Sequence, residues 1–200
     1  MKRYWVYLLY VLRHKWFVFQ ECRKRDLHVP LLIALWHDWD KFLSDEFIPY
    51  ARFFHNPDGT PKQRREKSGY YKPTDTGDNA FDYAWFLHQK RNKHHWQYWV
   101  IPQDHAGVKV LPMPDLYIRE MIADWRGAGR AQGVKKPAPW AVRDWYLANG
   151  YKLQMHDETR TKVEDYIGVK PTDRDLIRWE IENGRPIPNE ELAPASEVRL

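Results

Sequence analysis

The stretch ALWHDWDKFLSDEF, residues 34–47, places the pair His37-Asp38, with Lys41 close behind, inside a segment rich in Leu, Trp and Phe. Burying ionisable groups costs free energy unless they pair with each other or bind a cation. The pair is therefore a surface pair, a satisfied pair in the core, or half of a metal site. Pro30 suits the first turn of a helix, so we predict a helix from Pro30 onward that carries His37 and Lys41 one turn apart.

Helical periodicity continues on both sides of this stretch. Apolar residues recur at spacings of three and four, and Gly, Pro and capping residues separate the segments. No alternation typical of strands and no internal repeat is visible, so the sequence predicts an all-α fold, a helical bundle. The other expected helices cover about 3–23, 44–54, about 80 to just before Pro102, 115 to the GAG at 127–129, 138–148, 157–167 and 173–182.

The chain of 200 residues is long enough to bury a core of its own. We expect residues 1–184 to form a single helical domain. Within it, residues 55–79 combine Pro, Gly, Asp and basic residues without periodicity, which predicts a long, mobile polar loop inserted into the domain. Residues 185–200 are rich in Pro and Glu and are expected to form an extended tail.

Composition limits the class of protein. Apolar residues make up 43% and aromatic residues 16% of the chain, as in a globular protein, and most tryptophans are expected in the core. The formal charge of +5 suits phosphate-bearing partners such as nucleotides. Cys22 is the single cysteine, which excludes an intramolecular disulfide and indicates the cytoplasm. The apolar run near the N-terminus is interrupted at residues 13–15 and is too short to cross a membrane.

Several expected helices each carry an ionisable residue on an apolar face. A lone histidine in that position is usually a hydrogen-bonded core residue, but several facing each other in a bundle indicate a metal centre. Imidazole with carboxylate suits Mn, Fe, Co, Ni or Zn, as one or two divalent ions. The candidate ligands are His14, His37, Asp38, His88, His94, His95 and Asp124.

The three candidates on the fourth expected helix cannot all bind one ion if that helix is continuous. His88 and His95 lie seven residues apart, about 10 Å along a helix. The segment RNK, residues 91–93, is where a break would bring them together. The sequence leaves open which of these histidines are ligands.

The order of these residues resembles the HD-domain superfamily of metal-dependent phosphohydrolases. His14, the pair His37-Asp38 and Asp124 match its ligands, and the resemblance covers about residues 10–128. The stretch HDWDK resembles the His-Asp-x-x-Lys signature of the HD-GYP phosphodiesterase branch, and His94-His95 resembles its histidine pair. The chain also looks like an uncharacterised group of phage and bacterial proteins.

One element of the HD-GYP branch is missing. WQYWVIPQDHAG, residues 96–107, stands where the Gly-Tyr-Pro element would follow the histidine pair. Hydrolysis of cyclic di-GMP is therefore not expected.

The resemblance implies hydrolysis of a phosphomonoester or phosphodiester, of a nucleotide or a related small phosphate ester, by a metal-activated water. It places Lys41 beside the metals, where its charge can stabilise a phosphoryl oxygen, although Lys41 can equally form a plain salt bridge. Asp38 is placed to bridge two ions. Arg64, Arg65 and Lys67 in the long loop are candidates for binding substrate phosphates, or form a solvated charge cluster.

Two other functions remain open at this stage. A di-iron oxygenase of HD type would use a similar set of ligands, and a non-catalytic phage protein that binds a nucleotide or a host factor would need no metal. Nucleic acid is not an expected partner, because the charge is modest and no helix-turn-helix pattern is present. A homodimer is compatible with this class, and the expected location is the cytoplasm, that of the host if a phage encodes the protein.

Overall fold

The computed structural model describes residues 1–62, 76–136 and 138–183. Within these ranges the fold is mostly helical, with eight α-helices, three short 3-10 helices and one small hairpin, which confirms the all-α prediction. The elements are α1 (Lys2–Cys22), α2 (Leu31–Trp36), η1 (Trp39–Phe42), α3 (Ser44–Phe54), α4 (Asn79–Arg91), η2 (Trp96–Trp99), β1 (Val100–Pro102), β2 (Val108–Val110), α5 (Asp115–Ala131), α6 (Ala138–Asn149), η3 (Gly150–Lys152), α7 (Asp157–Ile167) and α8 (Pro171–Asn183).

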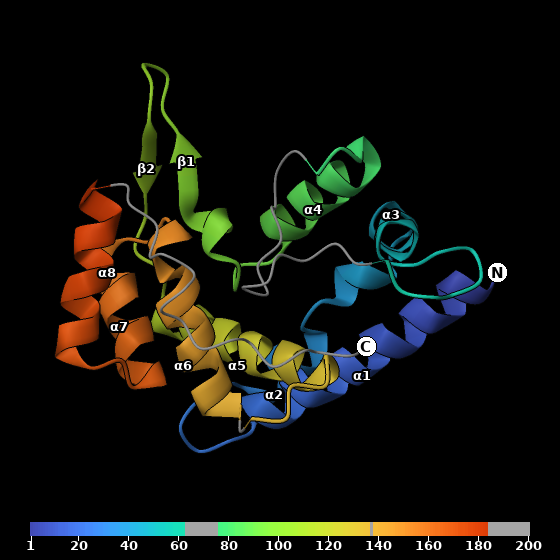
Figure 1. Cartoon of the computed structure of the whole chain (residues 1–200), viewed down its shortest axis with the longest axis horizontal. Coiled ribbons are helices and arrows are strands. Elements are labelled where there is room, and N and C mark those ends of the chain that lie inside the picture. Colours follow the sequence, from blue (N-terminus) through green and yellow to red (C-terminus); the bar gives the residue numbers. More distant parts are fainter. Residues whose placement is uncertain (63–75, 137, 184–200) are drawn as a thin grey trace.

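Helices α1 and α5 form the centre of the molecule (Figure 1). Helices α3 and α4 lie toward the N-terminal end of α1, and α6, α7 and α8 gather at the opposite end. Helices α1 and α5 approach each other closely at Gly127. A Cβ built there would lie 2.5 Å from Val18 Cγ2 and 2.7 Å from the Val18 backbone nitrogen. Only glycine fits this contact, and it fixes the distance between the two central helices.

Two apolar clusters flank the polar centre of the molecule. The larger joins α1 and α5 to α6, α7 and α8 and includes Val18, Ile122 and Tyr146. The smaller is aromatic and joins α1 to α3 and α4, with Phe53 and Phe81 stacked at 3.8 Å between ring centroids. Burial in these clusters holds the helices that carry the candidate ligands.

Three helix boundaries differ from the sequence prediction. The second helix ends at Trp36, so His37 and Lys41 do not share one helix. The fourth ends at Arg91 and is followed by a turn and η2, which confirms the break anticipated at residues 91–93. The fifth does not stop at the GAG but continues to Ala131, because its glycine at 127 serves the contact with α1.

The sequence analysis did not predict the hairpin of β1 and β2. The strands are antiparallel, three residues long and largely exposed, too short to display an alternating pattern. Ala106 and Gly107 form the turn with φ values of 108° and 81°. The expected tail at 185–200 lies outside the described residues, as do residues 63–75 of the expected loop. No helix among the described residues is long and apolar enough to cross a membrane.

Candidate metal centre

The backbone breaks its helical path where the pair His37-Asp38 stands. His37 ends α2, and Asp38 adopts a left-handed conformation with φ 52° and ψ 33° before η1 begins. Such a conformation is uncommon for residues other than Gly, Asn and Asp, and strained backbone positions cluster at functional sites. It turns both side chains into the interior, where His37 is 3% and Asp38 0% exposed.

One oxygen of Asp38 faces the first set of ligands. Asp38 Oδ2 lies 3.2 Å from His14 Nε2 and 3.4 Å from His37 Nε2. Asp124 Oδ1 completes the set at 3.2 Å from His14 Nε2 and 3.5 Å from His37 Nε2. These four residues come from α1, the α2–η1 junction and α5 and form one cluster that could hold a metal ion. They are the four candidate ligands that the sequence analysis placed first.

The other oxygen of Asp38 faces a second set. Asp38 Oδ1 lies 3.3 Å from His94 Nε2 and 3.5 Å from His88 Nε2. The chain turns back after α4 ends at Arg91, and this turn brings the ring centroids of His88 and His95 to 4.7 Å from each other. The ligand atoms of Asp38, His88, His94 and His95 all lie within 4.8 Å of one another.

The spacing of these atoms fits metal coordination. At bond lengths of about 2.1 Å, neighbouring ligands of a tetrahedral ion lie about 3.4 Å apart. Six distances from Asp38 or Asp124 oxygens to histidine Nε2 atoms are 3.2–3.5 Å, and all ligand atoms of each set lie within 4.8 Å of one another. Buried atoms that lack a hydrogen-bond partner in the described part of the chain include His37 Nε2, His94 Nε2, His95 Nε2, Asp38 Oδ1 and Asp124 Oδ1. Buried polar atoms rarely stay unsatisfied, and each of the two sets, which share Asp38, could hold a metal ion.

A glutamate that the sequence analysis missed orients two of the histidines. Glu120 Oε1 lies 3.0 Å from His37 Nδ1 and 3.3 Å from His94 Nδ1. Burial opposes ionisation of Glu120, but hydrogen bonds from these two histidines outweigh it and lower its pKa to about 2. The carboxylate therefore accepts hydrogen bonds from the two Nδ1 atoms, which leaves Nε2 as the nitrogen of each ring that faces the ligand cluster. Glu120 lies four residues before Asp124 on α5, and this spacing, which places both on one face of the helix, was the signal in the sequence that could have identified it.

Two further carboxylates act in the same way on His88. Its Nδ1 atom lies 2.8 Å from Asp40 Oδ2 and 3.1 Å from Glu46 Oε2. Asn92 also donates to Asp40 Oδ2 at 2.6 Å, at the break that ends α4. The sequence offered Glu46 only as a helix-start residue, because no local pattern shows that it reaches a histidine 42 positions away.

Charge is concentrated around Asp38. Burial opposes its ionisation, but His37 and Lys41 outweigh burial and hold the pKa of Asp38 well below its usual range. Lys41 Nζ lies 2.5 Å from Asp38 Oδ2, and its side chain is 14% exposed. Burial together with repulsion from His94 and His88 keeps the pKa of His95 well below its usual range, so His95 presents a neutral imidazole, the form that binds metals.

Metal binding is expected to depend on pH through His94. Burial opposes its protonation, but the nearby carboxylates of Asp38 and Glu120, each 3.3 Å away, outweigh burial and raise its pKa to about 10. Since the ordinary value is 6.5, this proton stabilises the metal-free fold fully below pH 6.5, and the contribution is lost as pH rises through 10. Ligation needs the neutral ring, so metal binding must release this proton.

We therefore expect the apparent metal affinity to rise with pH, by about tenfold per unit for each proton released, up to about pH 10. The melting temperature of metal-free protein should fall between pH 6.5 and 10, while that of metal-loaded protein should fall less. Calorimetric titration in buffers of different ionisation enthalpy measures the protons directly. Binding that releases no proton at pH 7 would contradict this assignment.

The remaining predicted site residues stand as follows. Lys41 contacts Asp38 as a buried ion pair, whereas Arg64, Arg65 and Lys67 lie outside the described residues. The expectation that tryptophans are mostly core is wrong for those on α1 and around α2. Trp5, Trp16, Trp36 and Trp39 are 61%, 56%, 69% and 50% exposed.

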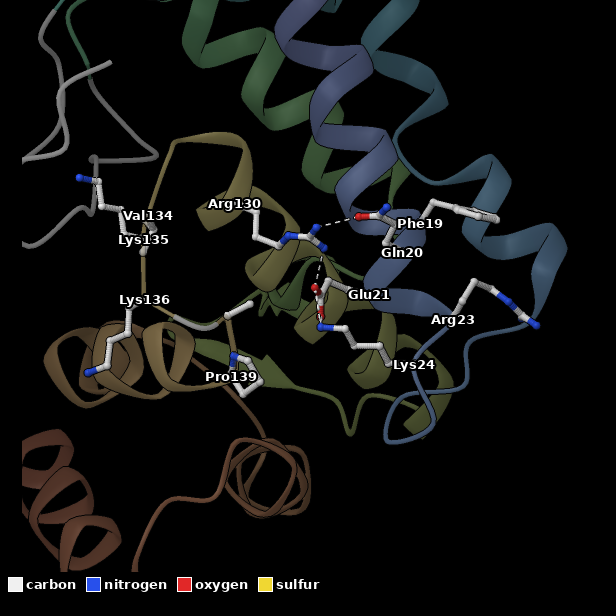
Figure 2. A pocket seen from close by; sticks show the side chains of 11 residues that line it. Phe19, Gln20, Glu21, Arg23, Lys24, Arg130, Val134, Lys135, Lys136 and Pro139 are labelled. Carbon is white, nitrogen blue, oxygen red and sulfur yellow. Dashed lines mark hydrogen bonds and ion pairs between the residues drawn. The ribbon is translucent and has the colours of Figure 1, made fainter.

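A cavity of about 730 Å³ lies away from this centre, at the C-terminal ends of α1 and α5 (Figure 2). Its lining is basic, but the cations closest to Glu21 are already engaged. Arg130 donates to Glu21 Oε1 at 2.8 Å and to Gln20 Oε1 at 2.7 Å, and Lys24 pairs with Glu21 at 2.7 Å. The cavity contains none of the clustered ligands and is separate from the metal centre.

Comparison with known proteins identifies the family but no activity. A family model described as a family of unknown function (DUF5662) matches residues 3–169, and the chain belongs to this family. No curated protein and no solved structure matches the chain. The matched range includes every candidate ligand of the two sets. Membership of the HD-domain superfamily is not assigned and stays an expectation from the motifs.

Proposed function

We propose that the protein is a metal-dependent phosphohydrolase that uses two divalent transition-metal ions to cleave a phosphate ester. The observation that carries the proposal is the position of Asp38, whose two carboxylate oxygens each face a separate set of buried ligands. A carboxylate that bridges two ions is typical of centres that hydrolyse phosphate esters. Mn, Fe, Co, Ni and Zn all suit these nitrogen and oxygen ligands.

Bound ions would supply a hydroxide at neutral pH by lowering the pKa of a coordinated water. The chain's own residues hold and orient the centre. Glu120 fixes His37 and His94, while Asp40 fixes His88, which leaves the Nε2 atom of each ring directed to the ligand cluster. Contacts within the protein thus hold the rings of these three histidines in position.

Lys41 supports phosphate as the substrate group. Burial opposes its charge, but Asp38 and Asp124 outweigh burial and raise the pKa of Lys41 well above its usual range. A permanently charged ammonium beside the ligand cluster can stabilise the negative charge that grows on phosphoryl oxygens in the transition state. The net charge of +5 suits the same class of substrate, and a nucleotide is the substrate we propose.

The Lys41→Met protein tests this proposal. We expect hydrolysis of a generic phosphodiester and of nucleotides to fall about 100-fold, as for loss of one transition-state donor. Metal content should be retained, because Lys41 competes with the ions for Asp38 Oδ2. Turnover of bis(4-nitrophenyl) phosphate and of a nucleotide panel by protein loaded with each metal is the measurement. Lys109→Met, an exposed lysine on β2, is the control.

Other results would replace the proposal. Metal-loaded protein that binds a nucleotide but hydrolyses no phosphate ester would identify a binding protein. Iron-loaded protein that consumes oxygen and shows a visible absorption band would identify an oxygenase. Both measurements use the same preparations as the hydrolysis assay.

A further inference from the structure

The outer face of α1 is apolar and exposed. Four large side chains on this face recur at spacings of four, three and four residues, which places them in one stripe. They are Trp5, Leu9, Leu12 and Trp16, which are 61%, 49%, 49% and 56% exposed. His14 and Val18 lie on the opposite, buried face of the helix. The stripe can therefore be covered without obstructing the metal centre.

Helix α2 and η1, which Lys15 joins to α1, carry further exposed apolar side chains. Lys15, beside Trp16 in the sequence, donates to the His37 carbonyl and lies 5.9 Å from the ring of Phe42. Trp36 and Trp39, which flank His37-Asp38, stack at 5.4 Å between ring centroids. Leu35, Trp36 and Trp39 are 51%, 69% and 50% exposed.

The size of this surface exceeds what a monomer usually leaves uncovered. Aromatic side chains offer about 150–250 Å² each, so the exposed parts of the four tryptophans and three leucines on α1, α2 and η1 together amount to on the order of 800 Å². The largest apolar patch of a monomer is about 300–600 Å². One partner of a stable dimer contributes about 800 Å². The surface therefore has the area of one side of a dimer interface.

The order of the side chains indicates the partner. Read in either direction, the stripe is Trp, Leu, Leu, Trp with the same spacings of four, three and four. A two-fold axis between Leu9 and Leu12 would thus bring Trp5 against Trp16 of the partner subunit and Leu9 against Leu12 of the partner subunit. Such self-complementarity is what a symmetric dimer requires. We propose that a second copy of this chain covers the stripe, with the two α1 helices antiparallel.

The charges agree with this arrangement. The same two-fold axis places Arg13 opposite Leu8 of the partner subunit and Lys15 opposite Val6 of the partner subunit, so no cation faces a cation. A lipid surface would also accept Trp and Leu beside basic residues, but it gives no reason for the palindromic order. The antiparallel dimer accounts for both the order and the charges.

The Leu12→Arg protein tests the dimer. Analytical ultracentrifugation of wild-type protein at micromolar concentration should give a dimer, and Leu12→Arg should raise the dissociation constant at least about tenfold, since each dimer carries the charge twice. Leu176→Arg on α8 is the matched control, because Leu176 is 50% exposed but outside the stripe. Helical content and metal content should be unchanged in both proteins.

The orientation is tested separately. A spin label attached at Lys2→Cys should report label-to-label distances near 25 Å or longer, because antiparallel helices place these residues at opposite ends of the seam. Native Cys22 is buried and does not compete for the label. Distances near 10 Å would overturn the antiparallel arrangement. Wild-type protein that is monomeric at tens of micromolar, or that instead binds anionic lipid vesicles through this stripe, would overturn the dimer.

Discussion

Asp38→Asn protein should contain almost no bound metal and hydrolyse phosphate esters about a thousandfold more slowly or worse. The amide keeps the shape of the carboxylate but removes its charge and one of its two accepting oxygens. Because Asp38 faces His14 and His37 with one oxygen and His88 and His94 with the other, a single substitution affects both sets of ligands. No other ligand in the described part of the chain belongs to both sets.

Two further variants, each of which alters only one of the two sets of ligands, test whether Asp38 serves both sets. Asp124→Asn alters only the first set and His95→Gln only the second, so each should retain about one ion where the wild type holds about two. Elemental analysis gives these numbers, and circular dichroism checks that the helices persist. Asp45→Asn, at an exposed carboxylate that pairs with Arg91, is the control. Wild-type metal content in Asp38→Asn would show that Asp38 bridges no ions.

The candidate ligands of the first set could be named from the sequence because His14 and Asp124 each stand on the inward face of a predicted helix. His14 repeats the spacing of buried residues on α1, and Asp124 does so on α5. The Asp38 side chain points into the interior, as the sequence predicted, but for a different reason. A continuous helix was predicted there, whereas a left-handed residue turns the side chain inward.

The second set depends on tertiary structure that local patterns do not contain. His94 and His95 follow the end of α4, and their position relative to His88 is set by the turn at Asn92, which itself bonds to Asp40. The outer carboxylates are similarly hidden, since Glu46 and Glu120 look like ordinary charges on amphipathic helices. Their contacts join segments 42 and 83 residues apart. The residue types suggested a metal site, but only the tertiary structure shows which carboxylate contacts which histidine.

Gly127→Ala should destabilise the protein by about 3 kcal/mol, which corresponds to a fall in melting temperature of about 6–12 °C. Added Cβ would lie 2.5 Å from Val18 Cγ2 and 2.7–2.8 Å from the Val18 backbone, far inside van der Waals contact. Backbone atoms cannot move aside as a flexible side chain can. Helices α1 and α5 must therefore separate or slide.

The same substitution should also weaken metal binding. His14 lies one turn before Val18 on α1, and Asp124 lies three residues before Gly127 on α5, so movement at this contact is transmitted to the first set of ligands. We expect metal affinity to fall at least about tenfold, as when the support of a ligand is disturbed. Calorimetric titration with the metal, beside thermal unfolding of metal-free protein, separates the two effects.

Gly129→Ala is the matched control on the same helix. Its added Cβ would meet only Val134, at 3.9 Å, which is ordinary contact. Alanine favours a helix by up to about 1 kcal/mol over glycine, so this protein should be as stable as the wild type or more so. If both variants behaved alike, the GAG would matter only for helix propensity. Opposite signs would show that the close contact of α1 with α5 at Gly127 stabilises the fold, and a loss of metal affinity in Gly127→Ala alone would show that this contact supports the first set of candidate ligands.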